Sequence, residues 1–188
     1  MKIFAIIGSQ RPHGKSMEII NFLQSKKEKH DIEYVHLGEK TYNSCVQCFC
    51  CSNDAKCHIQ DNFNDEILNK IKETDILIIT SPLFSFVPSK LAAVLERLTS
   101  VSYFYEDKTG NKRPLKGKKC AVVCYNSQKV HYSLENEIKS IMKQIVATKR
   151  SPYKFLNDKS TITKTHVDVI EYLEEIFTGP IENMEGKK

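Results

Sequence analysis

The sequence has no long hydrophobic run. Its longest apolar stretches, residues 3–7 and 76–79, fall far short of the roughly 20 residues that a membrane-spanning helix needs. The first stretch is also too short for the core of a secretory signal, which takes about 7 to 15 apolar residues. We therefore expect no contact with a membrane and a cytoplasmic location, where thiols are kept reduced.

The chain also lacks internal repeats and any break in composition. Its 188 residues, 40% of them hydrophobic, match the size of one globular domain at about 150 residues per domain. We expect this domain over residues 1–178 and a flexible tail over residues 179–188. The net charge of +5 is modest and gives no reason to expect a nucleic-acid partner.

Short apolar runs alternate with stretches of helical periodicity. The runs predict strands at residues 2–7, 32–37, 76–80 and 121–125, and a weaker one near Tyr153 and Phe155. The periodic stretches predict helices at residues 16–23, 61–71, 88–98, 134–145 and 169–177, and the polar residues 102–118 predict a long loop. This order predicts an α/β fold: a flavodoxin-like, doubly wound sheet of five parallel strands in the order 2-1-3-4-5, with helices on both faces.

The loop Gly8–Ser16 joins the first strand to the first helix. Its backbone N–H groups and the N-terminus of the helix favour an anion, so we predict a phosphate site there. Ser9 and Ser16 can donate hydroxyl groups, while Arg11 and Lys15 add charged donors. The alternative is that these residues only shape the turn and cap the helix.

Gly14-Lys15-Ser16 also ends the signature of nucleoside triphosphatases, but the spacing disagrees. The leading glycine of that signature would stand at position 9, which is Ser9. No acidic residue follows residues 76–80 to hold magnesium. We therefore reject this interpretation.

Two further loops are expected at the same edge of the sheet. The first follows the third strand and contains Pro82, Leu83, Phe84 and Ser85. The second follows the fourth strand and contains Tyr125, Asn126 and Ser127. A flat ring could lie between them, although Phe84 is equally typical of a protein core.

Five of the seven cysteines lie between positions 45 and 57. Cys45, Cys48, Cys51 and Cys57 form the pattern C-x2-C-x2-C-x5-C, with Cys50 as the spare cysteine. In a reducing compartment this crowding favours metal or redox chemistry, and the compact spacing favours a 4Fe-4S cluster over structural zinc. Zinc, free thiols and redox disulfides remain alternatives. Cys120 and Cys124 are expected to be small buried residues of the fourth strand.

With these motifs the chain resembles the NADPH-dependent FMN reductase family of flavodoxin-like proteins, and within it the iron-sulfur flavoproteins. The likeness rests on the Gly8–Ser16 loop, on residues 81–91, on Glu96-Arg97, on residues 115–123, and on the cysteine motif followed by Asp61. Two departures are Gln47, which stands where glycine is usual, and Lys15, which stands where asparagine is frequent.

The resemblance implies the following roles. The FMN phosphate would be held by Ser9, Arg11, Lys15 and Ser16. The isoalloxazine ring would be lined by Pro82, Leu83, Phe84 and Ser85, and enclosed by Tyr125, Asn126 and Ser127. The four ligands of a cluster would be Cys45, Cys48, Cys51 and Cys57.

We therefore expect an oxidoreductase that passes electrons from NAD(P)H or reduced ferredoxin through FMN, with the help of a 4Fe-4S cluster, to a small acceptor. No side chain is expected to be catalytic, because the cofactors carry the chemistry. A homodimer or homotetramer is expected from the family. The alternative is a non-enzymatic electron carrier or a zinc-stabilised binding protein on the same fold. The basic residues between Lys108 and Lys119 either form a solvated loop or steer an acidic partner or NADPH.

Overall fold

The computed structural model describes residues 2–25, 31–82, 86–126, 141 and 153–157. The segments expected to be helical at residues 134–145 and 169–177, and the expected tail at residues 179–188, lie outside the described residues apart from residue 141. Within the described part, the parallel α/β architecture predicted from the sequence is confirmed.

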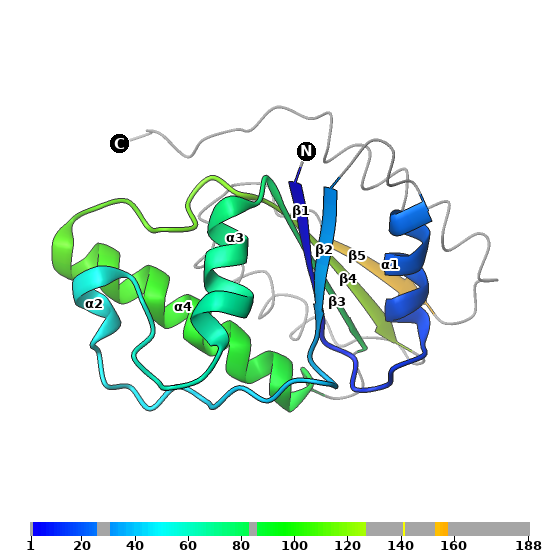
Figure 1. The fold of residues 1–188 in the computed structure, drawn as a ribbon, viewed down its shortest axis with the longest axis horizontal. Coiled ribbons are helices and arrows are strands. Elements are labelled where there is room, and N and C mark those ends of the chain that lie inside the picture. Colours follow the sequence, from blue (N-terminus) through cyan, green and yellow to red (C-terminus); the bar gives the residue numbers. More distant parts are fainter. Residues whose placement is uncertain (1, 26–30, 83–85, 127–140, 142–152, 158–188) are drawn as a thin grey trace.

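The centre of the fold is a five-stranded sheet in the order β2-β1-β3-β4-β5, with every neighbouring pair of strands parallel (Figure 1). Its strands are β1 (Lys2–Ile7), β2 (Asp31–His36), β3 (Ile76–Pro82), β4 (Lys119–Asn126) and β5 (Tyr153–Asn157). Ile3–Ile7 and Ile76–Ile79 are buried throughout, which explains why both read as unbroken apolar runs.

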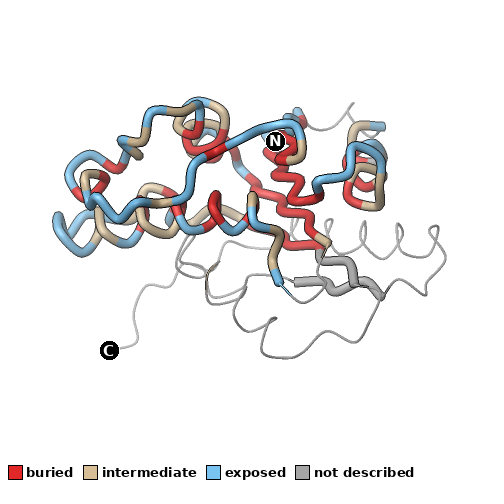
Figure 2. Tube along the Cα trace, turned by 90° about the horizontal axis from the view of Figure 1, so that it is seen from below, coloured by how far each residue is buried: buried red, intermediate tan, exposed pale blue. Residues whose placement is uncertain are grey.

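Helices cover both faces of the sheet (Figures 1 and 2). On one face α1 (Lys15–Ser25) packs Ile19, Ile20 and Leu23 against the side chains that point that way from β1 and β3. On the other face lie α2 (Cys51–Asp54), the π-helical turn η1 (Asn64–Leu68) continued by α3 (Asn69–Glu73), and α4 (Ser89–Thr109). Four apolar residues within the helix expected at residues 61–71 are fully buried: Phe63, Ile67, Leu68 and Ile71.

Helix α4 is longer than the sequence predicts. The polar residues from Ser102 onward were expected to be a loop, but the helix continues to Thr109. Val101 and Ser102 are buried, and Phe104 and Tyr105 pack against the core, so tertiary contacts keep this polar stretch helical. The helix ends at Gly110, which adopts a left-handed conformation with φ of 68° and donates its N–H to the carbonyl of Glu106 at 2.9 Å.

In a parallel sheet all strands end at the same edge. Ile7 pairs with Thr80 across β1 and β3, and Pro82 pairs with Tyr125 across β3 and β4, so the segments that follow these strands emerge side by side. This edge carries the Gly8–Ser16 loop and the N-terminus of α1. No helix in the described part of the chain is long and apolar enough to span a bilayer.

Gly110→Ala should lower the free energy of unfolding by about 1 kcal/mol, because a side chain disfavours the left-handed conformation that ends α4. A β-carbon at this position would meet no atom within 4 Å, so the cost is purely conformational. Urea unfolding measures it, with Asn111→Ala as the control. An unchanged midpoint for Gly110→Ala would contradict this end of the helix.

Candidate functional site

The Gly8–Ser16 loop is held close to the sheet. Gly8 donates its N–H to the carbonyl of Thr80 at 2.7 Å. A β-carbon on Gly8 would lie 2.7 Å from Leu91 Cδ2 and 3.1 Å from that carbonyl, so the close approach of β1, β3 and α4 requires glycine. Ser9 is buried and its hydroxyl accepts the N–H of Arg11 at 3.1 Å.

The residues predicted to hold phosphate lie around the start of α1. Ser9 and Ser16 are buried, Lys15 is half-buried, and Arg11 is exposed. Because Ser16 stands in the first turn of α1, it is close to N–H groups that have no partner within the helix. Thr80 Oγ1, at the same edge, is buried without a hydrogen-bond partner among the described residues. This edge therefore combines helix N–H groups with a buried hydroxyl that a ligand can satisfy.

The other two predicted flavin loops are only partly described. Pro82 ends β3 and is half-buried, while Leu83, Phe84 and Ser85 lie outside the described residues. For Tyr125 and Asn126 the backbone is described as the end of β4, and Ser127 lies outside the described part. The backbone register places Pro82 beside Tyr125, so the two segments begin next to each other.

The cysteine segment runs along α4 away from the sheet (Figure 1). The Cys45 N–H bonds to a carboxylate oxygen of Glu96 at 3.3 Å, and Cys45 Sγ lies 3.5 Å from the hydroxyl of Ser100. Helix α4 supports the cysteines from Glu96 onward, eight or more residues beyond Pro88 and so about 12 Å or more along its axis.

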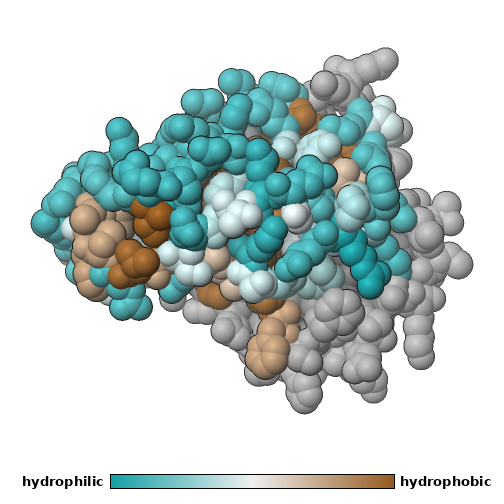
Figure 3. All heavy atoms as spheres, turned by 60° about the horizontal axis from the view of Figure 1, so that its bottom comes forward, coloured by the Kyte–Doolittle hydropathy of each residue, from teal (hydrophilic) through white to brown (hydrophobic). Residues whose placement is uncertain are grey.

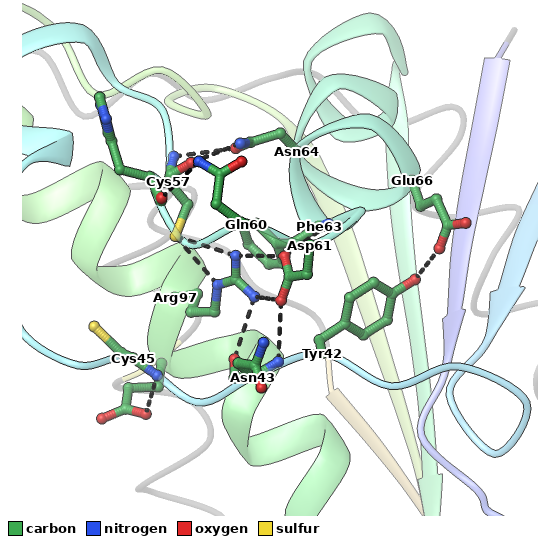
Figure 4. A network of polar contacts seen from close by, with 12 residues as sticks. Tyr42, Asn43, Cys45, Cys57, Gln60, Asp61, Phe63, Asn64, Glu66 and Arg97 are labelled. Atoms are coloured by element: carbon green, nitrogen blue, oxygen red, sulfur yellow. Dashed lines mark hydrogen bonds and ion pairs between the residues drawn. The ribbon is translucent and has the colours of Figure 1, made fainter.

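Arg97 lies at the centre of a network of polar contacts beside the cysteine segment (Figure 4). No role in the site was predicted for this residue from the sequence. Its side chain has 0% exposure although arginine is rarely buried completely. The guanidinium donates Nη1–H and Nη2–H to the two carboxylate oxygens of Asp61 at 2.6 and 2.9 Å. It also donates Nε–H and Nη2–H to Cys57 Sγ at 3.3 and 3.1 Å. One charged group therefore fixes both Asp61 and the last cysteine of the motif.

Arg97 makes two further contacts, a hydrogen bond and a cation–π contact. Nη1 also donates to the carbonyl of Asn43 at 3.2 Å, and the guanidinium carbon lies 3.9 Å from the centre of the Phe63 ring. Burial opposes the charge of Arg97, but its bonds to Asp61 and Cys57 outweigh that effect, so its pKa is raised. Two signals in the sequence pointed to these residues: Glu96-Arg97 and Asp61 belong to the stretches that carry the family likeness, and Arg97 is an arginine on the apolar face of a helix.

Asp61 is the partner that makes the buried charge tolerable. Its carboxylate accepts the backbone N–H of Asn43 at 3.0 Å and of Phe63 at 3.1 Å in addition to Arg97. Burial raises the pKa of Asp61, but the hydrogen bonds from Arg97, Asn43 and Phe63 outweigh burial and hold the pKa below its usual value. Asp61 therefore stays ionised. It lies just before the helical turn η1, which begins at Asn64, so the helix starts later than the expected position 61.

The cysteine segment contains three non-glycine residues in the left-handed conformation, Gln47 with φ of 51°, Phe49 with φ of 57° and Ala55 with φ of 55°. The first two flank Cys48 and turn the chain sharply, at a cost of roughly 1 kcal/mol or more per residue for an L-amino acid. Glycine would avoid this cost at position 47. The conformation therefore gives a physical reason for a glycine before the second cysteine.

The four predicted ligand cysteines differ in exposure. Cys48 is exposed, Cys45 and Cys57 are half-buried, and Cys51 is buried. Burial, followed by repulsion from Cys57, Cys45 and Cys48, raises the pKa of the Cys51 thiol to about 11. Among the described residues, no group of three or more histidine, cysteine, aspartate or glutamate side chains has the arrangement of a metal site.

Comparison with known proteins gives the family. The sequence pattern described as NADPH-dependent FMN reductase matches residues 1–155. The chain belongs to this family. It is thereby grouped with flavin-dependent oxidoreductases, as the resemblance predicted.

An iron-sulfur flavoprotein of Methanocaldococcus jannaschii is 36% identical to this family member over 102 residues. The match covers 52% of this chain and 51% of that protein, so the chain spans about half the length of the relative.

Solved structures share the fold at low sequence identity. An NAD(P)H:quinone oxidoreductase from Methanothermobacter marburgensis has a TM-score of 0.66 at 17% identity, over 95% of this chain and 98% of that one. An azoreductase from Bacillus anthracis has a TM-score of 0.57 at 15% identity, over 94% of this chain and 96% of that one. These likenesses support the flavodoxin-like architecture.

In this family member, some of the basic residues expected to form a solvated loop have partners in the fold. Lys118 donates to the backbone carbonyls of Lys72 and Thr74 at 2.7 and 2.5 Å, and Arg113 pairs with Glu106. Lys108 donates to the side chain of Asn53. These contacts tie the segment to α2 and α3 as well as to α4, so at least three of its charges help to hold the fold.

Arg97→Met should lower the free energy of unfolding of the metal-free protein by about 3–5 kcal/mol, because it leaves the Asp61 carboxylate buried without its cation. Adding Asp61→Asn should recover part of that loss, since the amide oxygen can still accept the N–H of Phe63. Urea unfolding of the two variants measures the coupling.

Lys40→Met provides the control. It breaks the ion pair between Lys40 and Glu66, whose side chains are 45% and 28% exposed, and should cost at most about 1 kcal/mol. If Arg97→Met and Lys40→Met lowered the free energy of unfolding equally, the stabilising role of Arg97 would be contradicted.

Proposed function

We propose that this protein is an FMN-dependent oxidoreductase that takes electrons from NAD(P)H or reduced ferredoxin and passes them to a small acceptor. The observation that carries the proposal is the placement of the Gly8–Ser16 loop between the end of β1 and the start of α1, beside the ends of β3 and β4. The family match over residues 1–155 supports a flavin as the ligand that we place at this edge.

The chain offers suitable groups for the phosphate of FMN. The N-terminus of α1 supplies partial positive charge and N–H donors, and Ser16 supplies a hydroxyl in its first turn. Arg11 and Lys15 bring the positive charge that a phosphate dianion needs. Thr80 Oγ1, which has no hydrogen-bond partner in the described part of the chain, suits a ligand bound at this edge. FMN, when bound, supplies the hydride and single-electron chemistry that no side chain here can provide.

The double variant Arg11→Ala/Ser16→Ala should weaken FMN binding at least about tenfold, because it removes a charged donor and a hydroxyl donor to the phosphate. Flavin fluorescence titration measures the dissociation constant. Lys70→Ala is the control, because Lys70 pairs with Glu33 and takes no part in the loop. FMN affinity that is equal in the double variant and in the wild type would contradict the phosphate assignment.

We further propose that Cys45, Cys48, Cys51 and Cys57 hold a 4Fe-4S cluster. Their compact spacing suits a cubane, and the matched relative is named an iron-sulfur flavoprotein. Repulsion from Cys57, Cys45 and Cys48 contributes to the raised pKa of the Cys51 thiol, and an iron or zinc cation would offset such repulsion between thiolates. The left-handed residues around Cys48 give the tight loop that such ligation needs. A cluster exchanges single electrons, whereas a flavin can also accept electron pairs.

Cys48→Ser should lose the cluster and Cys50→Ser should keep it, because Cys48 belongs to the ligand pattern and Cys50 does not. In the structure Cys50 Sγ donates to the carbonyl of Cys48 at 3.6 Å, so Cys50 is a control from the same loop. Iron and sulfide analysis after anaerobic purification measures the outcome. Equal iron loss in both variants would mean that the ligand set is wrong.

Cofactor analysis and activity assays on the same preparation separate the proposed oxidoreductase from the alternative functions. Iron, sulfide and FMN together support the oxidoreductase with a cluster. Zinc as the only bound cofactor, with no flavin, would instead support the zinc-stabilised binding protein, and flavin without turnover of NADPH, NADH or reduced ferredoxin would support an electron carrier.

We also propose a homodimer or homotetramer. Hydrophobic side chains gather at the end of the molecule formed by α2 and the far half of α4 (Figure 3). Val46 is 69% exposed, Phe49 53% and Tyr103 46%, and the Phe49 and Phe104 rings pack edge to face with their centres 4.8 Å apart. Such a surface suits burial against another protein. Light scattering measures whether the mass in solution exceeds that of one chain.

A further inference from the structure

Three residues stand side by side at the carboxyl edge of the sheet. His36 at the end of β2 and Thr80 in β3 both pair with Ile7 at the end of β1. His36 is only 4% exposed, which is unusual for an ionisable side chain at the end of a strand. Nothing in the sequence motifs gives His36 a role.

His36 is bonded to the phosphate loop. Its Nε2 lies 3.0 Å from the backbone carbonyl of Arg11. A carbonyl oxygen only accepts, so Nε2 carries the hydrogen and the ring has one defined tautomer. The other nitrogen, Nδ1, is buried without a partner among the described residues. Among the described residues, the ring is therefore held in place by one hydrogen bond to the loop and by packing.

Both backbone groups of Arg11 are fixed by side chains. The N–H is bonded to the Ser9 hydroxyl at 3.1 Å, from within the loop. The carbonyl is bonded to His36, from the neighbouring strand. Arg11 lies in the middle of the loop, so these two bonds determine how the peptide groups before and after it are oriented.

Gly38, which follows β2, lies so close to the His36 ring that no side chain fits at this position. A β-carbon on Gly38 would lie 2.6 Å from His36 Cε1, 2.9 Å from His36 Nδ1 and 2.7 Å from the carbonyl oxygen of Gln10. Lys90 of α4 donates to the carbonyl of Gly38 at 3.1 Å and holds that turn in place. Gly38 thus packs directly against the His36 ring and against the loop.

We propose that His36 is a positioning residue for the flavin phosphate, acting through the Arg11 carbonyl. An anion site needs N–H groups toward the ligand and carbonyl oxygens turned away from it. The Nε2–H bond holds the Arg11 carbonyl toward the end of β2, where its negative dipole cannot oppose a phosphate. This inference rests on the proposed FMN function and adds a residue outside the loop to the phosphate site.

The test compares FMN with riboflavin, which carries the same ring system and lacks the phosphate. Wild-type protein should bind FMN more tightly than riboflavin. His36→Ala should reduce that preference about fivefold to tenfold, the size of one hydrogen bond, while riboflavin affinity stays unchanged. His36→Gln should retain the preference because its amide nitrogen can replace Nε2, whereas His36→Asn is too short to reach and should lose it.

Val35→Ala controls for a general loss of stability at the same strand end, since Val35 is buried on the other face of the sheet. It should leave the preference for FMN intact. An equal loss of FMN and riboflavin affinity in His36→Ala would make His36 merely structural and overturn the inference, as would an unchanged preference in both His36→Ala and His36→Asn. A wild-type protein without any preference for FMN would overturn the phosphate site itself, which distinguishes the two failures.

Discussion

The buried ion pair between Arg97 and Asp61 is the interaction on which the cysteine segment depends. Removing two charges from water costs several kcal/mol per ion, and the pair is tolerated only because almost every donor and acceptor is bonded. Arg97 contributes bonds to Asp61, to Cys57 and to the carbonyl of Asn43, and Asp61 accepts two backbone N–H groups besides. Three stretches of chain that have no regular pairing with one another are thereby joined to α4.

This arrangement explains how a segment with little regular structure can keep a defined shape. The cysteine segment has one short helix, α2, and two strained residues beside Cys48, so its own backbone contributes little stability. The side chains that hold it come from α4: Glu96 and Ser100 contact Cys45, and Arg97 contacts Cys57. The extension of α4 beyond the sheet is therefore the platform of the proposed metal centre, and the sheet edge is the platform of the proposed flavin site.

The two sites are stabilised by different physics. The sheet edge depends on close backbone approach: Gly8 and Gly38 leave no space for a side chain, and Arg11 is oriented because Ser9 accepts its N–H and His36 bonds to its carbonyl. Along α4, charged hydrogen bonds stabilise the segment, because the Arg97 guanidinium bonds to the Asp61 carboxylate and to the Cys57 sulfur together. A change at one site is expected to leave the other intact, since they share only the body of α4.

The sequence by itself determined the parallel α/β architecture, the place of the Gly8–Ser16 loop and the cysteine pattern. These depend on local signals: unbroken apolar runs for buried strands, glycine and serine after β1, and cysteines at fixed spacing. Tertiary structure alone decided the rest. Polar residues 102–109 are helical because Val101, Phe104 and Tyr105 pack on a core that lies elsewhere in the chain. Arg97 and Asp61 lie 36 positions apart, and His36 lies 25 positions from Arg11. Such pairs leave no periodicity in the sequence, because the energy that fixes them arises only when folding removes both partners from water.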